Sequence, residues 1–162
     1  MDLLAATSLY RAHCEEIGLP SKEPHGIDRE SYWFFADQTP VIGRSGLIIR
    51  KQDGLLTVVG SALGHRREMI FWAYESGLLT GKCDLVITRI TGDVNDVIDV
   101  LTKTPPSQRG MRLPGNGREK WRAALASLPA VAFAGANLYN YVHELWEARS
   151  HGTFSFEIRP VT

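Results

Sequence analysis

An Asp-Gly pair between two runs of β-forming residues limits the possible folds of this chain more than any other feature. Asp53 and Gly54 separate Gly46–Arg50 from Leu55–Gly60. Asp and Gly both accept the positive φ that a type I′ or bulged turn requires, and the flanking runs are rich in residues that strands prefer. The sequence therefore predicts a β-hairpin over residues 46–60.

Hydrophobic periodicity assigns the remaining elements. Apolar residues recur every three or four positions in the predicted helices, and they alternate or run together in the predicted strands. The expected helices are residues 2–17, 65–79, 93–101, 119–128 and 131–149, and the expected strands outside the hairpin are 32–35, 85–90 and 153–158. Residues 18–30, 37–40 and 102–118 are expected to be connections or loops.

This order of elements predicts an α+β fold. The strands are grouped too closely for a regular series of βαβ units, so we expect a mainly antiparallel sheet of about four or five strands packed on helices. The chain has 162 residues, of which 44% are apolar and 22% charged, as in an ordinary globular protein. A chain of this length is expected to form a single domain, residues 1–162.

Charge and the first residues of the chain exclude several classes of partner. Eighteen Lys and Arg residues balance eighteen Asp and Glu residues, so the molecule lacks the overall positive field that attracts nucleic acid or an anionic membrane. Asp2 stands where a secretory signal would carry basic residues, and no run of about eighteen apolar residues occurs. We therefore expect a cytoplasmic protein whose partner is neither a membrane nor a nucleic acid.

The Cys and His residues offer little for catalysis or metal binding. Cys14 and Cys83 stand far apart in apolar surroundings, which is typical of buried thiols rather than a disulfide framework. His143, Glu147 and His151 follow at four-residue steps, but a zinc-protease helix would carry His where Glu147 stands. A weak metal site and a polar helix face both fit this spacing, and the polar face is the simpler interpretation. We expect neither a metal nor another cofactor, and no catalytic residue is assigned.

A basic segment supports one alternative function. Residues 103–122 contain six basic side chains and one acidic side chain, with Arg109, Arg112 and Arg118 among the basic ones. A loop of this kind beside a helix N-terminus can bind an anion. In that case the chain is a small enzyme or effector whose loop 102–118 holds an anionic or nucleotide ligand. Otherwise the charges only keep an exposed loop solvated.

An acidic helix face supports a different function. Asp93, Asp96 and Asp99 recur every three residues in the predicted helix 93–101, and at about 100° per residue they share the side opposite the apolar residues. Three like charges on one face repel one another. The face is therefore either a solvated helix surface or a docking surface for a basic partner, and these three Asp residues are the predicted partner-binding residues.

A motif of aromatic and glycine residues surrounds the predicted hairpin. It consists of Trp33-Phe34-Phe35, then Gly43-Arg44-Ser45-Gly46-Leu47-Ile48-Ile49, then Asp53-Gly54 through Val58-Val59-Gly60-Ser61. With this motif, residues 32–65 resemble the YrhB-like immunity-protein family of bacteria, in which a Trp-bearing strand precedes a Gly-x-Gly-Pro-type turn, a hairpin closed by Gly, and a Gly-Thr pair that leads to a helix. In this chain Leu47 replaces the expected Pro, and Ser61 replaces the expected Thr.

The resemblance implies a function. Proteins of this kind act in the cytoplasm, where they bind and block a toxin domain made by the same cell, usually encoded beside them, without catalysis of their own. We therefore predict an immunity protein, or antitoxin, whose partner is a cognate toxin protein. An accessory interaction protein without a toxin is a third possibility, beside the anion-binding enzyme or effector.

Overall fold

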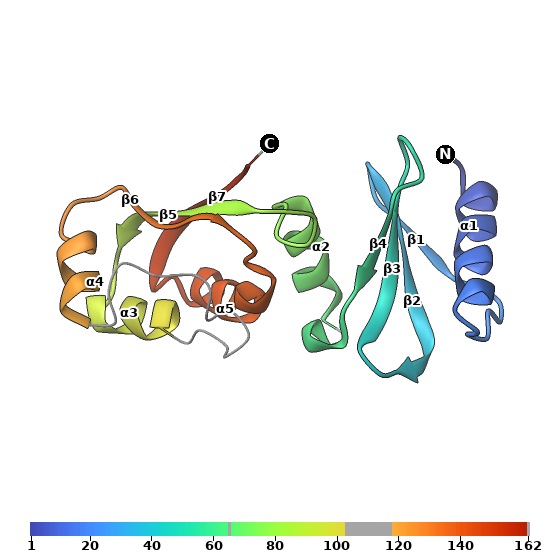
Figure 1. Cartoon of the computed structure of the whole chain (residues 1–162), viewed down its shortest axis with the longest axis horizontal. Coiled ribbons are helices and arrows are strands. Elements are labelled where there is room, and N and C mark those ends of the chain that lie inside the picture. The colour runs from blue at the N-terminus through green and yellow to red at the C-terminus, as the bar shows by residue number, and fades with distance from the viewer. Residues whose placement is uncertain (65, 103–117, 162) are drawn as a thin grey trace. The chain divides into compact units, whose positions relative to one another are not determined.

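The computed structural model describes residues 1–64, 66–102 and 118–161 (Figure 1). The chain divides into two compact units, Met1–Arg66 and Arg67–Thr162. Each unit contains helices and one antiparallel sheet, so the predicted α+β class is confirmed. The strands form one four-stranded and one three-stranded sheet, instead of the one sheet of four or five strands that we expected. The single domain over residues 1–162 stays a prediction.

The first unit packs one helix on a four-stranded sheet. Its elements are α1 (Leu3–Glu16), β1 (Gly26–Asp28), β2 (Tyr32–Val41), β3 (Arg44–Arg50), β4 (Leu56–Val59) and a short 3₁₀ helix, η1 (Ser61–Leu63). The strands lie in chain order, and each pairs antiparallel with the next. Figure 1 shows α1 beside this sheet.

Alternate residues of β2 and β3 form the core beneath α1. Side chains two residues apart in a strand point to the same face of the sheet. The resulting buried cluster contains Ala6, Tyr10 and Cys14 of α1, Trp33 and Phe35 of β2, and Leu47 and Ile49 of β3. The rings of Tyr10 and Phe35 stack with their centroids 4.9 Å apart. Burial, followed by the hydrogen bond with Cys14, raises the pKa of Tyr10, so the phenol stays uncharged in this core.

The predicted hairpin is confirmed as β3 and β4. Gly54 has a φ of +74°, whereas no residue other than glycine has a positive φ in the described part of the chain. The turn therefore differs from type I′, in which both central residues have positive φ. The Asp53 carboxylate accepts hydrogen bonds from Arg50 Nε at 2.8 Å and from the Leu55 backbone N–H at 3.1 Å. These bonds lower the pKa of Asp53 to about 2, and the hydrogen bond from Arg50 has the largest effect.

Two predictions for the first unit are wrong. The expected loop at 37–40 belongs to β2, which continues to Val41 and turns at Gly43, where φ is +82°. The register between β2 and β3 shifts after Ala36, and an irregularity of this kind accommodates a proline within a strand. The expected connection at 18–30 contains the short strand β1, which pairs with β2.

The second unit packs helices on a three-stranded sheet. Its elements are α2 (Arg67–Glu75), β5 (Cys83–Ile90), α3 (Val94–Thr102), α4 (Arg118–Leu125), β6 (Ala130–Ala136), η3 (Tyr139–Tyr141), α5 (Val142–His151) and β7 (Phe154–Pro160). Strand β5 is central and pairs antiparallel with β6 and with β7. The predicted helices 2–17, 65–79, 93–101 and 119–128 and strands 85–90 and 153–158 are confirmed with shifted ends. No helix in the described ranges is long and apolar enough to span a membrane.

The predicted helix at 131–149 is wrong in its first half. Residues Ala130–Ala136 form the edge strand β6, and α5 begins only at Val142. Alanine favours helices in isolation, but pairing with β5 from a distant part of the chain decides the conformation here. The Asp84 carboxylate of β5 also accepts a hydrogen bond from the Gly135 N–H at 2.7 Å, which holds the end of β6 in place.

Candidate protein-binding surface

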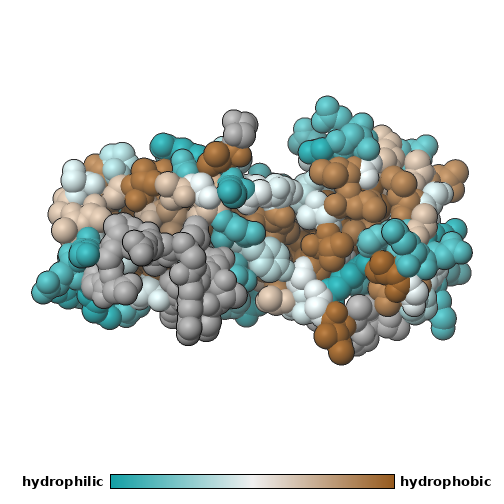
Figure 2. All heavy atoms as spheres, in the orientation of Figure 1, coloured by the Kyte–Doolittle hydropathy of each residue, from teal (hydrophilic) through white to brown (hydrophobic). Residues whose placement is uncertain are grey.

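Helix α3 carries the predicted partner-binding carboxylates on its exposed side. Asp93, Asp96 and Asp99 are exposed, whereas Val97 and Ile98 are fully buried. The helical spacing in the sequence therefore assigns the charged and apolar sides correctly. In Figure 2 the surface at α4, which packs against α3, is also hydrophilic.

The three Asp side chains have different surroundings. The Asp93 carboxylate caps α3, because its Oδ1 lies 2.8 Å from both the backbone nitrogen and the Nδ2 atom of Asn95. Asp99 Oδ1 lies 2.8 Å from Nη1 of Arg118 in α4, and both side chains are about half exposed. Asp93 thus stabilises the start of α3, Asp99 joins α3 to α4, and Asp96 lines a hollow.

The hollow at Asp96 lies between α3 and α5, and we call it the α3–α5 hollow. It has a volume of about 270 Å³ and is lined by Asp96, Val100, His143, Glu144, Glu147, Ala148, His151 and Thr153. Residues three and four positions apart share one side of a helix, so Glu144 and Glu147 of α5 both reach it. Two carboxylates of α5 therefore join Asp96 of α3 on one concave surface.

The two α5 carboxylates differ in their contacts. The oxygens of Glu147 lie 3.9 Å from His143 Nε2 and 3.7 Å from His151 Nδ1. The Oε2 atom of Glu144 is buried and accepts no hydrogen bond from the residues that the structure describes. A buried acceptor that lacks a donor costs about 1–3 kcal/mol. Glu144 is therefore a lining residue with unused capacity to accept a hydrogen bond.

The spacing of His143, Glu147 and His151 forms a polar helix face in the structure. Helix α5 continues to His151, so all three residues lie on one side of it. Among the described residues, no group of three or more His, Cys, Asp or Glu side chains could hold a metal ion. Cys14 and Cys83 are buried free thiols, as predicted, and burial followed by the charge of Asp84 raises the pKa of Cys83.

The predicted anion-binding residues fall into two groups. Arg109 and Arg112 lie outside the described residues. Arg118 is the first residue of α4, and its ion pair with Asp99 joins one member of the predicted basic set to one member of the acidic set. Farther along α4, Nη2 of Arg122 donates to the Asn95 side-chain oxygen at 2.7 Å. Both arginines of α4 thus contact α3.

Sequence analysis missed Glu144 as part of the site. The signal was present in part, because Glu144 stands between His143 and Glu147 on a helix that was predicted to have a polar face. What the sequence does not reveal is that α5 packs close enough to α3 for Glu144 to share a hollow with Asp96. That contact depends on tertiary packing between distant segments.

No protein-family model, curated protein or solved structure matches this chain. The resemblance of residues 32–65 to YrhB-like immunity proteins therefore stays a prediction that rests on its motif. The described residues themselves provide a concave acidic surface formed by α3 and α5. Its chemical complement is a basic side chain.

Proposed function

We propose that this chain is a cytoplasmic immunity protein, which binds a cognate toxin domain and neutralises it. The observation that carries the proposal is the α3–α5 hollow, in which Asp96 of α3 joins Glu144 and Glu147 of α5. The resemblance of residues 32–65 suggests the class of protein. The hollow suggests where the partner is bound and what charge it presents.

The unused oxygen of Glu144 favours a cationic group as the bound element. Oε2 of Glu144 is buried without a hydrogen-bond donor from the described chain, and Asp96 and Glu147 add negative charge to the same hollow. If the Glu144 side chain turns into the hollow, an Arg or Lys side chain of the partner would donate to its carboxylate. Hydrogen bonds to charged groups contribute about 1.5–3 kcal/mol, so one such contact would account for a substantial part of the binding energy.

The size of the hollow suits one inserted side chain. Its volume of about 270 Å³ lies just below the roughly 300–1,000 Å³ that is usual for small-molecule pockets. Asp93, just before α3, and Asp99 within it are also exposed and would contribute to the electrostatic attraction of a basic surface, Asp99 less so because it pairs with Arg118. In this proposal Asp96 and Glu144 contact the partner directly, and Asp93 and Asp99 increase the rate of association.

The alternative function is an enzyme or effector that holds an anionic or nucleotide ligand in the loop 102–118, and the described residues offer no observation in its favour. Arg118 is paired with Asp99, and Arg109 and Arg112 lie outside the described residues. We therefore do not propose it.

The proposal expects a toxin domain to be encoded beside this chain, and co-expression with that domain tests the proposed function. Cells that produce both proteins should grow, and cells that produce the toxin domain alone should not. Asp96→Asn and Glu144→Gln, which remove charge at nearly constant shape, should weaken protection and lower the affinity of the purified pair by about tenfold each. Glu15→Gln, an exposed carboxylate on α1 in the first unit, is the matched control.

The possible outcomes separate the function from the surface. Absence of protection by the unaltered chain would overturn the proposed function. Full protection that is equally strong with Asp96→Asn, Glu144→Gln and Glu15→Gln would keep the function but exclude the α3–α5 hollow as the binding surface.

A further inference from the structure

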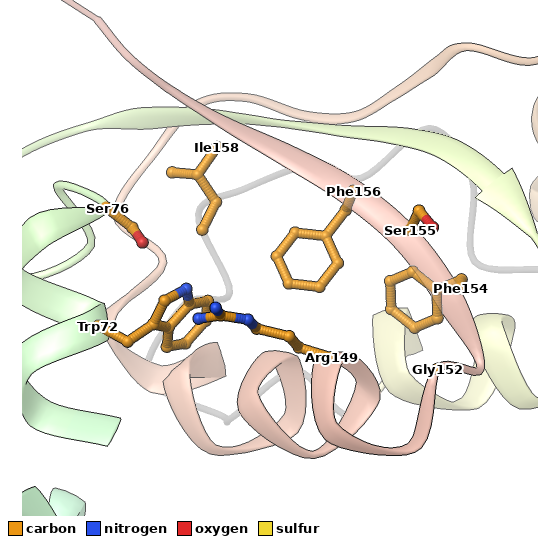
Figure 3. A pocket seen from close by; sticks show the side chains of 8 residues that line it. All are labelled: Trp72, Ser76, Arg149, Gly152, Phe154, Ser155, Phe156 and Ile158. Atoms are coloured by element: carbon orange, nitrogen blue, oxygen red, sulfur yellow. The ribbon is translucent and has the colours of Figure 1, made fainter. Parts of the chain in front are cut away.

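A second hollow in the second unit is lined by aromatic side chains. It lies between the end of α2, the end of α5 and strand β7, and Figure 3 shows it from close by. Its volume is about 370 Å³, and it is lined by Trp72, Ser76, Arg149, Gly152, Phe154, Ser155, Phe156 and Ile158. This volume falls within the roughly 300–1,000 Å³ that is usual for small-molecule pockets. We call it the aromatic pocket.

The rings in this region contact one another and keep part of their surface accessible. Trp72 and Phe156 meet edge to face with centroids 6.3 Å apart, and Trp72 and Trp146 are tilted with centroids 5.5 Å apart. Trp72 and Phe156 are only half-buried, although both are large apolar residues. Aromatic surface that is held rigid and left partly exposed can stack on a planar ring of a ligand.

A cation lies on these rings. The Arg149 guanidinium carbon is 5.6 Å from the centroid of Trp72 and 5.8 Å from that of Trp146, and the side chain extends from α5 across the Trp72 ring (Figure 3). Arg149 is exposed, and it forms no ion pair with a carboxylate in the described ranges. Among the residues that line the pocket, Arg149 carries the charge. The other polar side chains of the lining are the hydroxyls of Ser76 and Ser155.

We propose that the aromatic pocket binds a small aromatic carboxylate. The ring of the ligand would pack on Trp72 and Phe156, and its carboxylate would accept two hydrogen bonds from the planar fork of Arg149. A group with a single negative charge fits better than a phosphate, because one Arg supplies one positive charge to the pocket.

This site is separate from the surface that the proposed function uses. Arg149 follows Glu147 by two residues in α5, and two residues along a helix differ in direction by about 200°. The aromatic pocket and the α3–α5 hollow therefore lie on opposite sides of α5. Binding of the two partners can be measured independently.

Ligand titration of the full chain with 1-naphthoate, followed by ligand-observed NMR and calorimetry, tests the proposal. Two matched compounds separate the contributions of charge and ring: 1-naphthamide has the same ring without the charge, and cyclohexanecarboxylate has the charge without the aromatic ring. We expect saturable binding of 1-naphthoate, with each matched compound at least about tenfold weaker.

Variants assign the binding to the pocket. Arg149→Gln should weaken 1-naphthoate binding by at least about tenfold, and Arg149→Lys should weaken it less, because Lys keeps the charge but loses the fork. Arg159→Gln is the control, because Arg159 is exposed on β7 and already contacts Glu157. Circular dichroism verifies that each variant is folded.

Three results would overturn the proposal. The first is a folded chain that shows no saturable binding of 1-naphthoate at millimolar concentrations. The second is equal affinity for 1-naphthoate and either matched compound. The third is an affinity of the Arg149→Gln variant that equals that of Arg159→Gln.

Discussion

The backbone at Gly54 offers a quantitative test of the first unit. Gly54 has a φ of +74°, in the left-handed region where a residue with a Cβ is penalised by about 1–2 kcal/mol. A Cβ at this position would lie 3.3 Å from Leu9 Cδ1 and from Met1 Cε, and both are flexible ends of side chains that can move slightly. The backbone penalty therefore dominates. We expect Gly54→Val to lower the free energy of unfolding by about 2 kcal/mol, the upper end of this range, because Val is β-branched.

Urea denaturation followed by circular dichroism measures this free energy. Gly54→Asn should cost less than Gly54→Val, because Asn enters the left-handed region more easily than a β-branched residue. Gly81→Val is the matched control, since no atom lies within 4 Å of a Cβ at Gly81 and its φ is not positive. Equal stability of the Gly54→Val and Gly81→Val variants, or equal losses for Val and Asn at position 54, would refute the reasoning.

Three further changes test other parts of the fold. Asp53 has a pKa of about 2 in the folded chain against an ordinary 3.8, so its contribution to stability is present above pH 4 and is lost as the pH falls toward 2. Asp53→Asn should therefore reduce the change in melting temperature between about pH 4 and 2, and an unchanged pH profile would contradict this. Gly46→Ala should destabilise the chain more than Gly54→Val does, because the new Cβ at position 46 would lie 2.6 Å from the Phe35 backbone oxygen. A smaller loss for Gly46→Ala in urea denaturation would contradict the register of β2 and β3. Leu85→Ala, at a fully buried position of β5, should cost about 2–5 kcal/mol in the same assay, and a loss below about 1 kcal/mol would contradict its place in the core.

The elements that sequence analysis predicts correctly are those whose pattern is local. The turn at Gly54 and the two sides of α3 follow from residues within a few positions of one another. Strand β6 was misassigned because an alanine-rich segment suits a helix as well as a buried strand. Its pairing with β5, which involves contacts such as Leu85 with Phe133, decides between the two.

The candidate surface likewise combines features that depend on local sequence with features that depend on tertiary packing. The exposure of Asp96 could be predicted from helical spacing, whereas its position opposite Glu144 could not, because these residues belong to helices that are distant in the sequence. The ion pair between Asp99 and Arg118 could not be predicted for the same reason. In the sequence the acidic residues and the basic residues form separate patches. Tertiary packing brings Asp99 of the acidic patch against Arg118 of the basic patch.

Binding kinetics of the Asp96→Lys variant with the purified toxin domain test the central claim most directly. Asp96 is exposed in the first turn of α3, so the reversal of its charge should leave the chain folded and lower the free energy of unfolding by about 0.6–2 kcal/mol through the helix dipole. We predict that Asp96→Lys slows association several-fold at low salt and reduces the dependence of the association rate on ionic strength, because the attraction of a basic partner is weakened. Association rates that equal those of the unaltered chain at both low and high salt would contradict the assignment of the α3–α5 hollow as the binding surface.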